Sequence, residues 1–189
     1  MADSLTFLDF AALIDRSLED PGAITELERR YLARVAILVI DFTGMVKRTE
    51  AAGIIYALAL SRAAMKSMEP ALTARSGQVI KQVADTFFAI FPGPEDALLG
   101  ALDAQAHLAA FNAGRADAIS ASMGLGYGDS LLLPGEDVFG AEVSRAFVLG
   151  EDVADCVAFA LSRPAHVSID SMLVMPTDQA SPKRVHRGG

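Results

Sequence analysis

The chain has 189 residues, of which 52% are hydrophobic and 21% are charged, so its composition is that of a folded domain with a sizeable core and excludes an intrinsically disordered protein. Its 16 basic and 24 acidic residues give a net charge of −8, which argues against a nucleic-acid-binding surface. An anionic ligand would therefore need local positive charge or a metal ion.

Three features of the sequence bear on where the protein works. The single cysteine, Cys156, excludes an internal disulfide and is expected to be a buried, inert thiol. The N-terminal residues lack the basic flank and apolar core of a signal peptide. The nearest approach to a membrane span, Ala51–Leu60, is shorter than the roughly 18 residues required. We therefore expect a cytoplasmic protein with no membrane span.

Residues 1–33 are predicted to form a helical N-terminal segment. Apolar residues recur at helical spacing over 4–19, and Asp20-Pro21-Gly22 ends that helix. A second, highly charged helix is expected over 23–33. Two interpretations stay open: the segment is a dimerising or signal-coupling element, or it simply packs against the domain that follows.

Residues 34–176 are predicted to form one domain that begins with a strand. The run Val35–Ile40 is so apolar that we expect a central strand covered on both faces. A long helix is predicted over 49–73. Two strands, 78–81 and 86–91, follow it and are joined by a short turn at Val83–Asp85.

The remaining segments complete an α+β arrangement. In chain order we expect a helix over 95–112, a strand over 119–125, a turn over 126–129, a returning strand over 131–133, a helix over 138–149, a strand over 166–174 and a flexible tail over 177–189. This order is typical of a split βαβ core, a mainly antiparallel sheet with helices on one face.

Two aspartates stand against the most apolar stretches of the chain. Asp41 ends the first strand, and Asp85 precedes the run from Thr86 to Phe91. A carboxylate at the rim of a buried strand is costly to desolvate unless positive charge meets it. If the fold brings the two together, they can hold a divalent metal ion.

Three short motifs occur in a fixed order. Asp41-Phe42-Thr43-Gly44 follows the first strand, Lys81 to Asp85 spans the predicted hairpin, and Asp137-Val138-Phe139-Gly140 comes later. As an ordered set, over about residues 34–155, they resemble the catalytic domain of class III adenylate and guanylate cyclases. The resemblance implies a ferredoxin-like core, a head-to-tail dimer with active sites at its interface, and attack of the ribose 3′-oxygen of ATP on the α-phosphate with loss of pyrophosphate.

The resemblance also assigns roles to individual residues. It implies that Asp41 and Asp85 bind two Mg²⁺ or Mn²⁺ ions and that Phe42–Gly44 supply backbone N–H groups near the phosphates. Lys81 and Asp137 match the pair that reads adenine, through an ammonium donor and a carboxylate acceptor. The alternatives are turn-capping for the two metal aspartates, a solvated strand lysine for Lys81 and a helix N-cap for Asp137.

The sequence departs from the family at several positions. Ala84 replaces the family glycine before the second aspartate and would be strained if that turn needs a positive φ. Ser144 and Val148 replace the asparagine and arginine that the family directs at the triphosphate and ribose. Arg145 points roughly 100° away around a helix, so it does not inherit the arginine's role. No match to the family's late lysine is found in 156–176.

These departures leave three functional hypotheses. Losing an arginine that meets transition-state charge lowers the rate about 10³–10⁵-fold, so a homodimer of this chain is expected to be a very poor adenylate cyclase. The second hypothesis is an inactive nucleotide-binding or regulatory module. The third is one half of a heterodimer, in which a partner with an intact asparagine and arginine completes a site around Asp41 and Asp85. A domain of unrelated chemistry is the remaining alternative.

Overall fold

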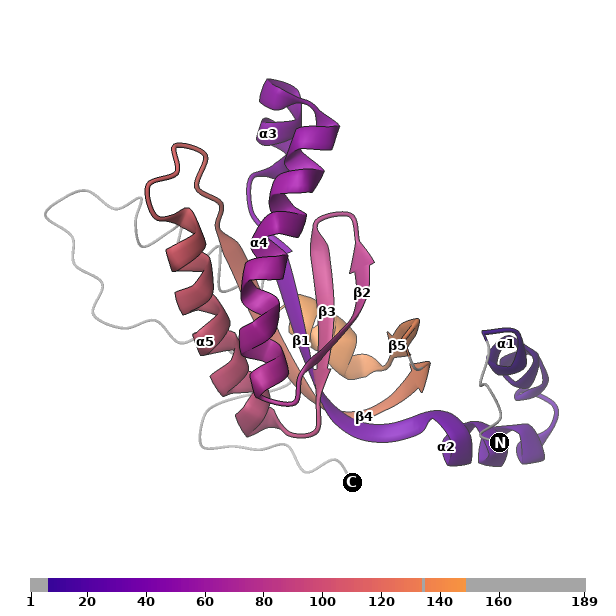
Figure 1. Cartoon of the computed structure of the whole chain (residues 1–189). Helices are drawn as coiled ribbons and strands as arrows, with labels where there is room; N and C mark the ends of the chain where they lie inside the picture. Colours follow the sequence, from indigo (N-terminus) through magenta and orange to yellow (C-terminus); the bar gives the residue numbers. More distant parts are fainter. Residues whose placement is uncertain (1–6, 134, 149–189) are drawn as a thin grey trace, which may run out of the picture.

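The computed structural model describes residues 7–133 and 135–148. Its centre is a five-stranded sheet of strand order β2-β3-β1-β4-β5, in which every neighbouring pair is antiparallel (Figure 1). The strands are β1 (Leu32–Phe42), β2 (Gln78–Val83), β3 (Thr86–Phe91), β4 (Ala121–Leu133) and β5 (Asp137–Phe139). The first four strands have the order expected of a split βαβ core, so the predicted fold class is confirmed.

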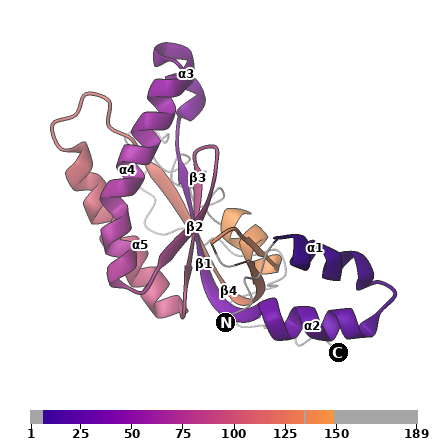
Figure 2. The same cartoon turned by 45° about the vertical axis from the view of Figure 1, so that its right-hand side comes forward.

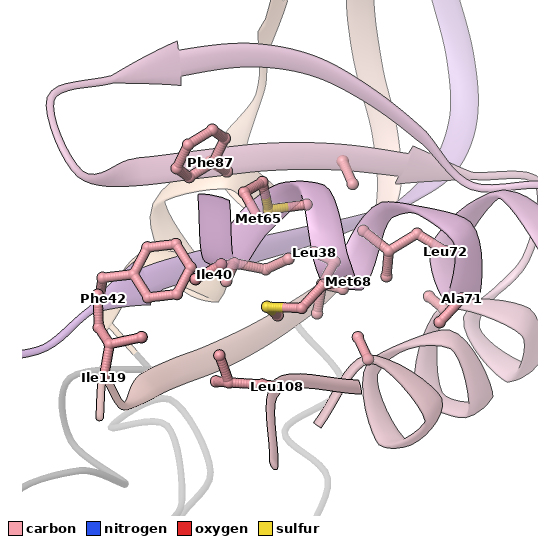
Figure 3. Close-up of a cluster of buried hydrophobic side chains, with 14 of the residues drawn as sticks. Leu38, Ile40, Phe42, Met65, Met68, Ala71, Leu72, Phe87, Leu108 and Ile119 are labelled. Atoms are coloured by element: carbon pink, nitrogen blue, oxygen red, sulfur yellow. The ribbon is translucent and has the colours of Figure 1, made fainter. Parts of the chain in front are cut away.

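The helices are α1 (Phe7–Arg16), α2 (Pro21–Tyr31), α3 (Met45–Ala52), α4 (Ile54–Ala74) and α5 (Pro94–Asn112), and residues 141–148 are also helical. The two long helices, α4 and α5, lie side by side and cover one face of the sheet. Alternate residues of β1, including Leu38 and Ile40, point into a core with Met68 and Leu72 of α4 and Leu108 of α5 (Figure 3).

The second face of the sheet has a smaller core. Val35, Ile37 and Val39 of β1 pack with Val138 of β5 and Ala146 of the helix 141–148. Figure 2 shows this short helix across the sheet from α4 and α5. Strand β1 is therefore covered on both faces, as its uniform apolar sequence predicts. The expectation of helices on one face only misses this short helix.

Two predicted elements are divided differently in the structure. The helix expected over 49–73 is two helices, because Gly53 has a φ of 88° and lies between α3 and α4. The helix expected over 138–149 begins only at 141, because residues 137–139 pair with β4 as the strand β5.

The strand, turn and returning strand expected between 119 and 133 are one continuous strand, β4. Gly126 and Gly128 suggested a turn, but they lie within the strand and face the helix 141–148. A Cβ atom at Gly126 would come within 2.4 Å of the Glu142 carbonyl oxygen. The glycines therefore permit close approach of the helix to the strand.

The helices α1 and α2 pack against the far end of β4, at the right of Figure 1. Phe10, Leu27 and Tyr31 form a third cluster with Leu133. Asp20 caps α2, since its Oδ1 accepts the Gly22 N–H at 2.9 Å. Packing against the domain is thus observed for this segment. The predicted strand 166–174, the tail 177–189 and Cys156 lie outside the described residues.

Candidate functional site

The two predicted metal aspartates lie at the same end of the sheet. Asp41 is opposite Thr86 of β3 and Ser122 of β4, and Asp85 immediately precedes Thr86. Both carboxylate residues are half-buried. The buried Thr86 hydroxyl donates a hydrogen bond to Asp41 Oδ1, which orients that carboxylate. The sequence suggested this placement only through the family resemblance of the motifs, and no sequence pattern singled out Thr86.

Asp85 is held in a two-residue hairpin turn with Ala84. Ala84 has a φ of 53°, in the left-handed region that favours glycine. The Gln82 side-chain amide donates to the Ala84 carbonyl oxygen at 2.7 Å. The turn therefore needs a positive φ at Ala84, the condition under which the sequence predicted strain. Alanine adopts this conformation at an expected cost of about 1–2 kcal/mol.

The segment expected to face the phosphates makes several contacts of its own. Phe42 is buried and packs edge-on against Phe87, with ring centroids 5.9 Å apart. The Thr43 N–H donates to the Ser120 carbonyl at 2.8 Å, so it is already engaged. Gly44, at φ 76°, leads into the first turn of α3. The N–H groups of a helix's first turn have no acceptor within the helix, so they are better placed than Thr43 to meet an anion.

Lys81 and Asp137 form an ion pair between the two edge strands of the sheet. Lys81 Nζ lies 2.7 Å from Asp137 Oδ2, and the side chains are 34% and 21% exposed. Asp137 Oδ1 also accepts the Val138 N–H at 2.8 Å. Asp137 belongs to β5, so the N-cap alternative is wrong. Lys81 is a partly exposed strand residue that also has an acidic partner.

Ser144 and Val148 lie on an exposed face of the helix 141–148. Both side chains are exposed, Val148 by 51%, and they are separated by one helical turn. Arg145 pairs with Glu142 on the same helix. Its guanidinium is therefore engaged locally, in keeping with the prediction that it does not replace the family arginine.

Two pockets flank the β2–β3 hairpin. One of about 270 Å³ is lined by Lys81, Gln82 and Phe87 together with Arg62 and Lys66 of α4. Arg62 donates to Gln82 Oε1 at 2.6 Å. No sequence motif contains Arg62 or Lys66, so their place beside Lys81 was not predictable from the sequence.

The second pocket adjoins Asp85. It has a volume of about 490 Å³ and a mainly apolar lining that includes Met45, Val46, Ile54 and Leu58 of α3 and α4. Met45 and Val46 make the surface beside Asp85 aliphatic.

No protein-family model matches the sequence. No curated protein matches it significantly either. Solved structures do match. A bacterial light-regulated adenylyl cyclase has a TM-score of 0.57 at 20% identity, over 65% of this chain and 71% of that one. An adenylate/guanylate cyclase/hydrolase from Silicibacter pomeroyi has a TM-score of 0.52 at 26% identity, over 70% and 84%.

A third match is the catalytic core of a rhodopsin-guanylyl cyclase with converted specificity, in complex with ATPαS. Its TM-score is 0.53 at 17% identity, over 64% of this chain and 72% of that one. The chain has the class III nucleotide cyclase fold. These matches agree with the family resemblance of the three motifs, and both adenylyl and guanylyl cyclases are among them.

Asp41 and Asp85 have the chemistry to bind a divalent metal ion that is also coordinated by the phosphates of a nucleotide. The described residues contain no group of three or more His, Cys, Asp or Glu side chains that could hold a metal ion. Mg²⁺ is commonly held by one or two carboxylates plus substrate phosphates and water, so Asp41 and Asp85 fit that requirement.

Within residues 7–133 and 135–148, no helix is long and apolar enough to cross a membrane.

Proposed function

We propose that this cyclase-fold domain binds a nucleoside triphosphate, with a preference for ATP, and converts it slowly to cyclic AMP and pyrophosphate. The observation that carries the proposal is the Lys81–Asp137 pair. The two residues are 56 positions apart, on opposite edge strands, yet their side chains meet at 2.7 Å. Such a juxtaposition of a donor and an acceptor is what adenine recognition requires.

Base selectivity follows from the polarity of the two groups. The Lys81 ammonium donates to a ring nitrogen of adenine, and the Asp137 carboxylate accepts from its exocyclic amine. Guanine in the same orientation presents the reverse pattern, a carbonyl oxygen to Asp137 and an N–H to Lys81, so neither side chain would be paired. A neighbouring cyclase structure in complex with ATPαS supports a nucleotide as the class of ligand, and the Lys81–Asp137 pair makes ATP the one to test first.

Asp41 and Asp85 would hold the Mg²⁺ or Mn²⁺ ions. When bound, these ions supply charge neutralisation for the triphosphate and lower the pKa of the attacking hydroxyl. The Thr86 hydroxyl keeps the Asp41 carboxylate in one orientation. The first turn of α3 directs N–H groups at the phosphates. We further propose that the domain works as a dimer.

Low turnover is part of the proposal. The exposed face of the helix 141–148 presents Ser144 and Val148, neither of which carries positive charge. Serine can donate one hydrogen bond, but valine cannot stabilise charge that develops in the transition state. The expected deficit relative to an arginine-containing site is about 10³–10⁵-fold.

The direct test is formation of cyclic AMP from Mn-ATP by the purified full chain. We expect slow product formation that Asp41→Ala abolishes, and ATP binding that Lys81→Ala or Asp137→Ala weakens. Asp103→Ala is the matched carboxylate control, because Asp103 of α5 pairs with Arg75 at the end of α4 and lines neither pocket beside the hairpin. Product formation that is absent, or unchanged in Asp41→Ala, would falsify turnover at this site.

The Ser144/Val148 face also favours a second function, as the metal-binding half of a heterodimer. That face is exposed and uncharged, whereas Asp41 and Asp85 are retained. Mixing this chain with a cyclase whose own metal aspartates are replaced by alanine would restore activity. The restored activity must vanish with Asp41→Ala in this chain. If mixing restores nothing but the chain binds ATP, the inactive nucleotide-binding module is the remaining candidate.

A further inference from the structure

The N-terminal helix α1 contacts the strand that carries Asp137. The Phe10 ring stacks on Phe139 of β5, with centroids 5.3 Å apart and ring planes inclined by 14°. Phe10 is 6% exposed and also meets the edge of the Tyr31 ring at 5.1 Å. A segment that precedes the cyclase fold thus touches one of the three motifs directly.

The same helical segment packs on β4, the strand that pairs with β5 among the described residues. Strand β5 is three residues long and pairs with Leu131–Leu133 of β4. Leu133 and Leu131 belong to the cluster of Phe10, which joins α1, α2 and β4. The N-terminal helices therefore contact both β5 and its support.

The geometry of β5 links the Phe139 ring to Asp137. Residues i and i+2 of a strand project from the same face, so Asp137 and Phe139 share one face of β5. Val138 projects from the other and packs into the core of the second sheet face. A three-residue edge strand has few hydrogen bonds of its own, so packing on its two faces decides where it lies. The Phe10 ring supplies that packing on the Asp137 side.

We propose that Phe10 is a positioning residue for nucleotide binding: by stacking on Phe139 it holds β5 so that the Asp137 carboxylate meets the base. The inference rests on the proposed function insofar as Asp137 reads the base. In this proposal the N-terminal helices change the affinity for the base of the nucleotide and leave the affinity for its triphosphate unchanged.

The test compares a ligand with a base and one without. Titration calorimetry on the full chain measures affinity for Mn-ATP and for Mn-tripolyphosphate. Phe10→Leu keeps an apolar side chain of similar size and removes the ring. We expect it to weaken ATP binding roughly fivefold, the equivalent of one aromatic pair, with no change for tripolyphosphate. Phe139→Leu, from the other side of the stack, should have the same effect.

Two control variants separate positioning from general loss of structure. Phe10→Tyr retains the ring and should bind ATP like the unaltered protein. Leu8→Ala lies on the same helix at 78% exposure and should change neither affinity. The inference is overturned if Phe10→Leu leaves ATP affinity unchanged, or weakens ATP and tripolyphosphate binding equally.

A nucleotide-free measurement keeps the inference separate from the proposed function. In the ¹³C NMR spectrum, the Asp137 carboxyl signal reports on its contact with Lys81. We expect Phe10→Leu to shift this signal and Leu8→Ala to leave it in place. If the unaltered protein binds no nucleotide, the proposed function fails, but the NMR measurement still tests whether Phe10 positions Asp137. An unshifted Asp137 signal in Phe10→Leu would overturn that positioning role.

Discussion

Ala84, like Ser76, is a non-glycine residue with a positive φ, so its side chain and backbone conformation conflict. It occupies the first position of the β2–β3 turn at φ 53°, and Asp85 is the second. Any L-residue with a Cβ is strained there, whereas glycine is not. The strain lies next to a proposed metal ligand, so its relief affects stability and the placement of Asp85 together.

We predict that Ala84→Gly stabilises the protein. Relief of about 1–2 kcal/mol of strain is partly offset by the greater unfolded-state entropy of glycine, so the net gain is about 0.5–1 kcal/mol. Urea unfolding measures it. Ala113→Gly is the matched control, since Ala113 is also exposed but has an ordinary φ of −59°. A loss of stability in Ala84→Gly as large as that in the control would contradict the prediction.

Individual site residues differed in how far the sequence could predict their surroundings. The sequence places Asp41 and Asp85 next to strands, but only the family resemblance implied that these strands are neighbours, as the structure shows. The meeting of Lys81 and Asp137, on opposite edges of the sheet, was likewise suggested only by the resemblance. The contact between Phe139 and Phe10 was not predictable, because no local sequence pattern indicates where the N-terminal helices pack.

At the scale of elements, β4 and the helix 141–148 form a unit. Glycine residues within a run of alternating polarity suggested a turn, because the sequence does not show what approaches them. In the structure the space above Gly126 and Gly128 is taken by Glu142. The helix that carries Ser144 and Val148 is therefore positioned by the absence of side chains on its neighbouring strand.

We predict that Gly126→Ala displaces this helix. The new Cβ would lie 2.4 Å from a backbone oxygen, so the helix or strand must move, at a cost of about 1–3 kcal/mol. Gly93→Ala is the control, because its Cβ would meet nothing within 4 Å and its φ of −148° suits alanine. Urea unfolding of both variants checks the prediction; equal stabilities would refute the close approach.

The helix α2 should contribute a pH-dependent term to stability. Hydrogen bonds from Arg29, and then from Arg30, lower the pKa of Glu26 from 4.5 to about 2. Because its pKa is lower in the folded state, the stabilisation is present above about pH 4.5 and is lost as the pH falls toward 2. Solvent screening makes the effect small.

Thermal unfolding between pH 2 and pH 6 tests this on variants. We expect Glu26→Gln to lose less stability than the unaltered protein as the pH falls through this range. Glu28→Gln, an exposed carboxylate on the same helix, is the control. Identical pH profiles for the two variants would count against the Glu26 contribution.

At the scale of the whole molecule, the described residues form the cyclase fold, while Ser144 and Val148 bring no positive charge to the proposed site. Adding back the family residues should therefore raise activity. We predict that Ser144→Asn with Val148→Arg increases cyclic AMP formation from Mn-ATP at least about hundredfold. Ser144→Asn with Val148→Gln, which adds no charge, is the control. Equal activity in the two double variants would show that the guanidinium has no transition-state charge to meet.

The Lys81–Asp137 ion pair has a consequence for selectivity among ligands. Without a nucleotide, the two groups that would contact the base neutralise each other at 2.7 Å. In the proposed function, a base can contact these two groups only after the ion pair between them has broken. Adenine can replace both halves of the broken contact, whereas a base with a different donor and acceptor order leaves two half-buried charges unmatched. Because breaking the contact costs the same for every base, it lowers all affinities equally, and selectivity among bases comes from how fully each base satisfies the two charges.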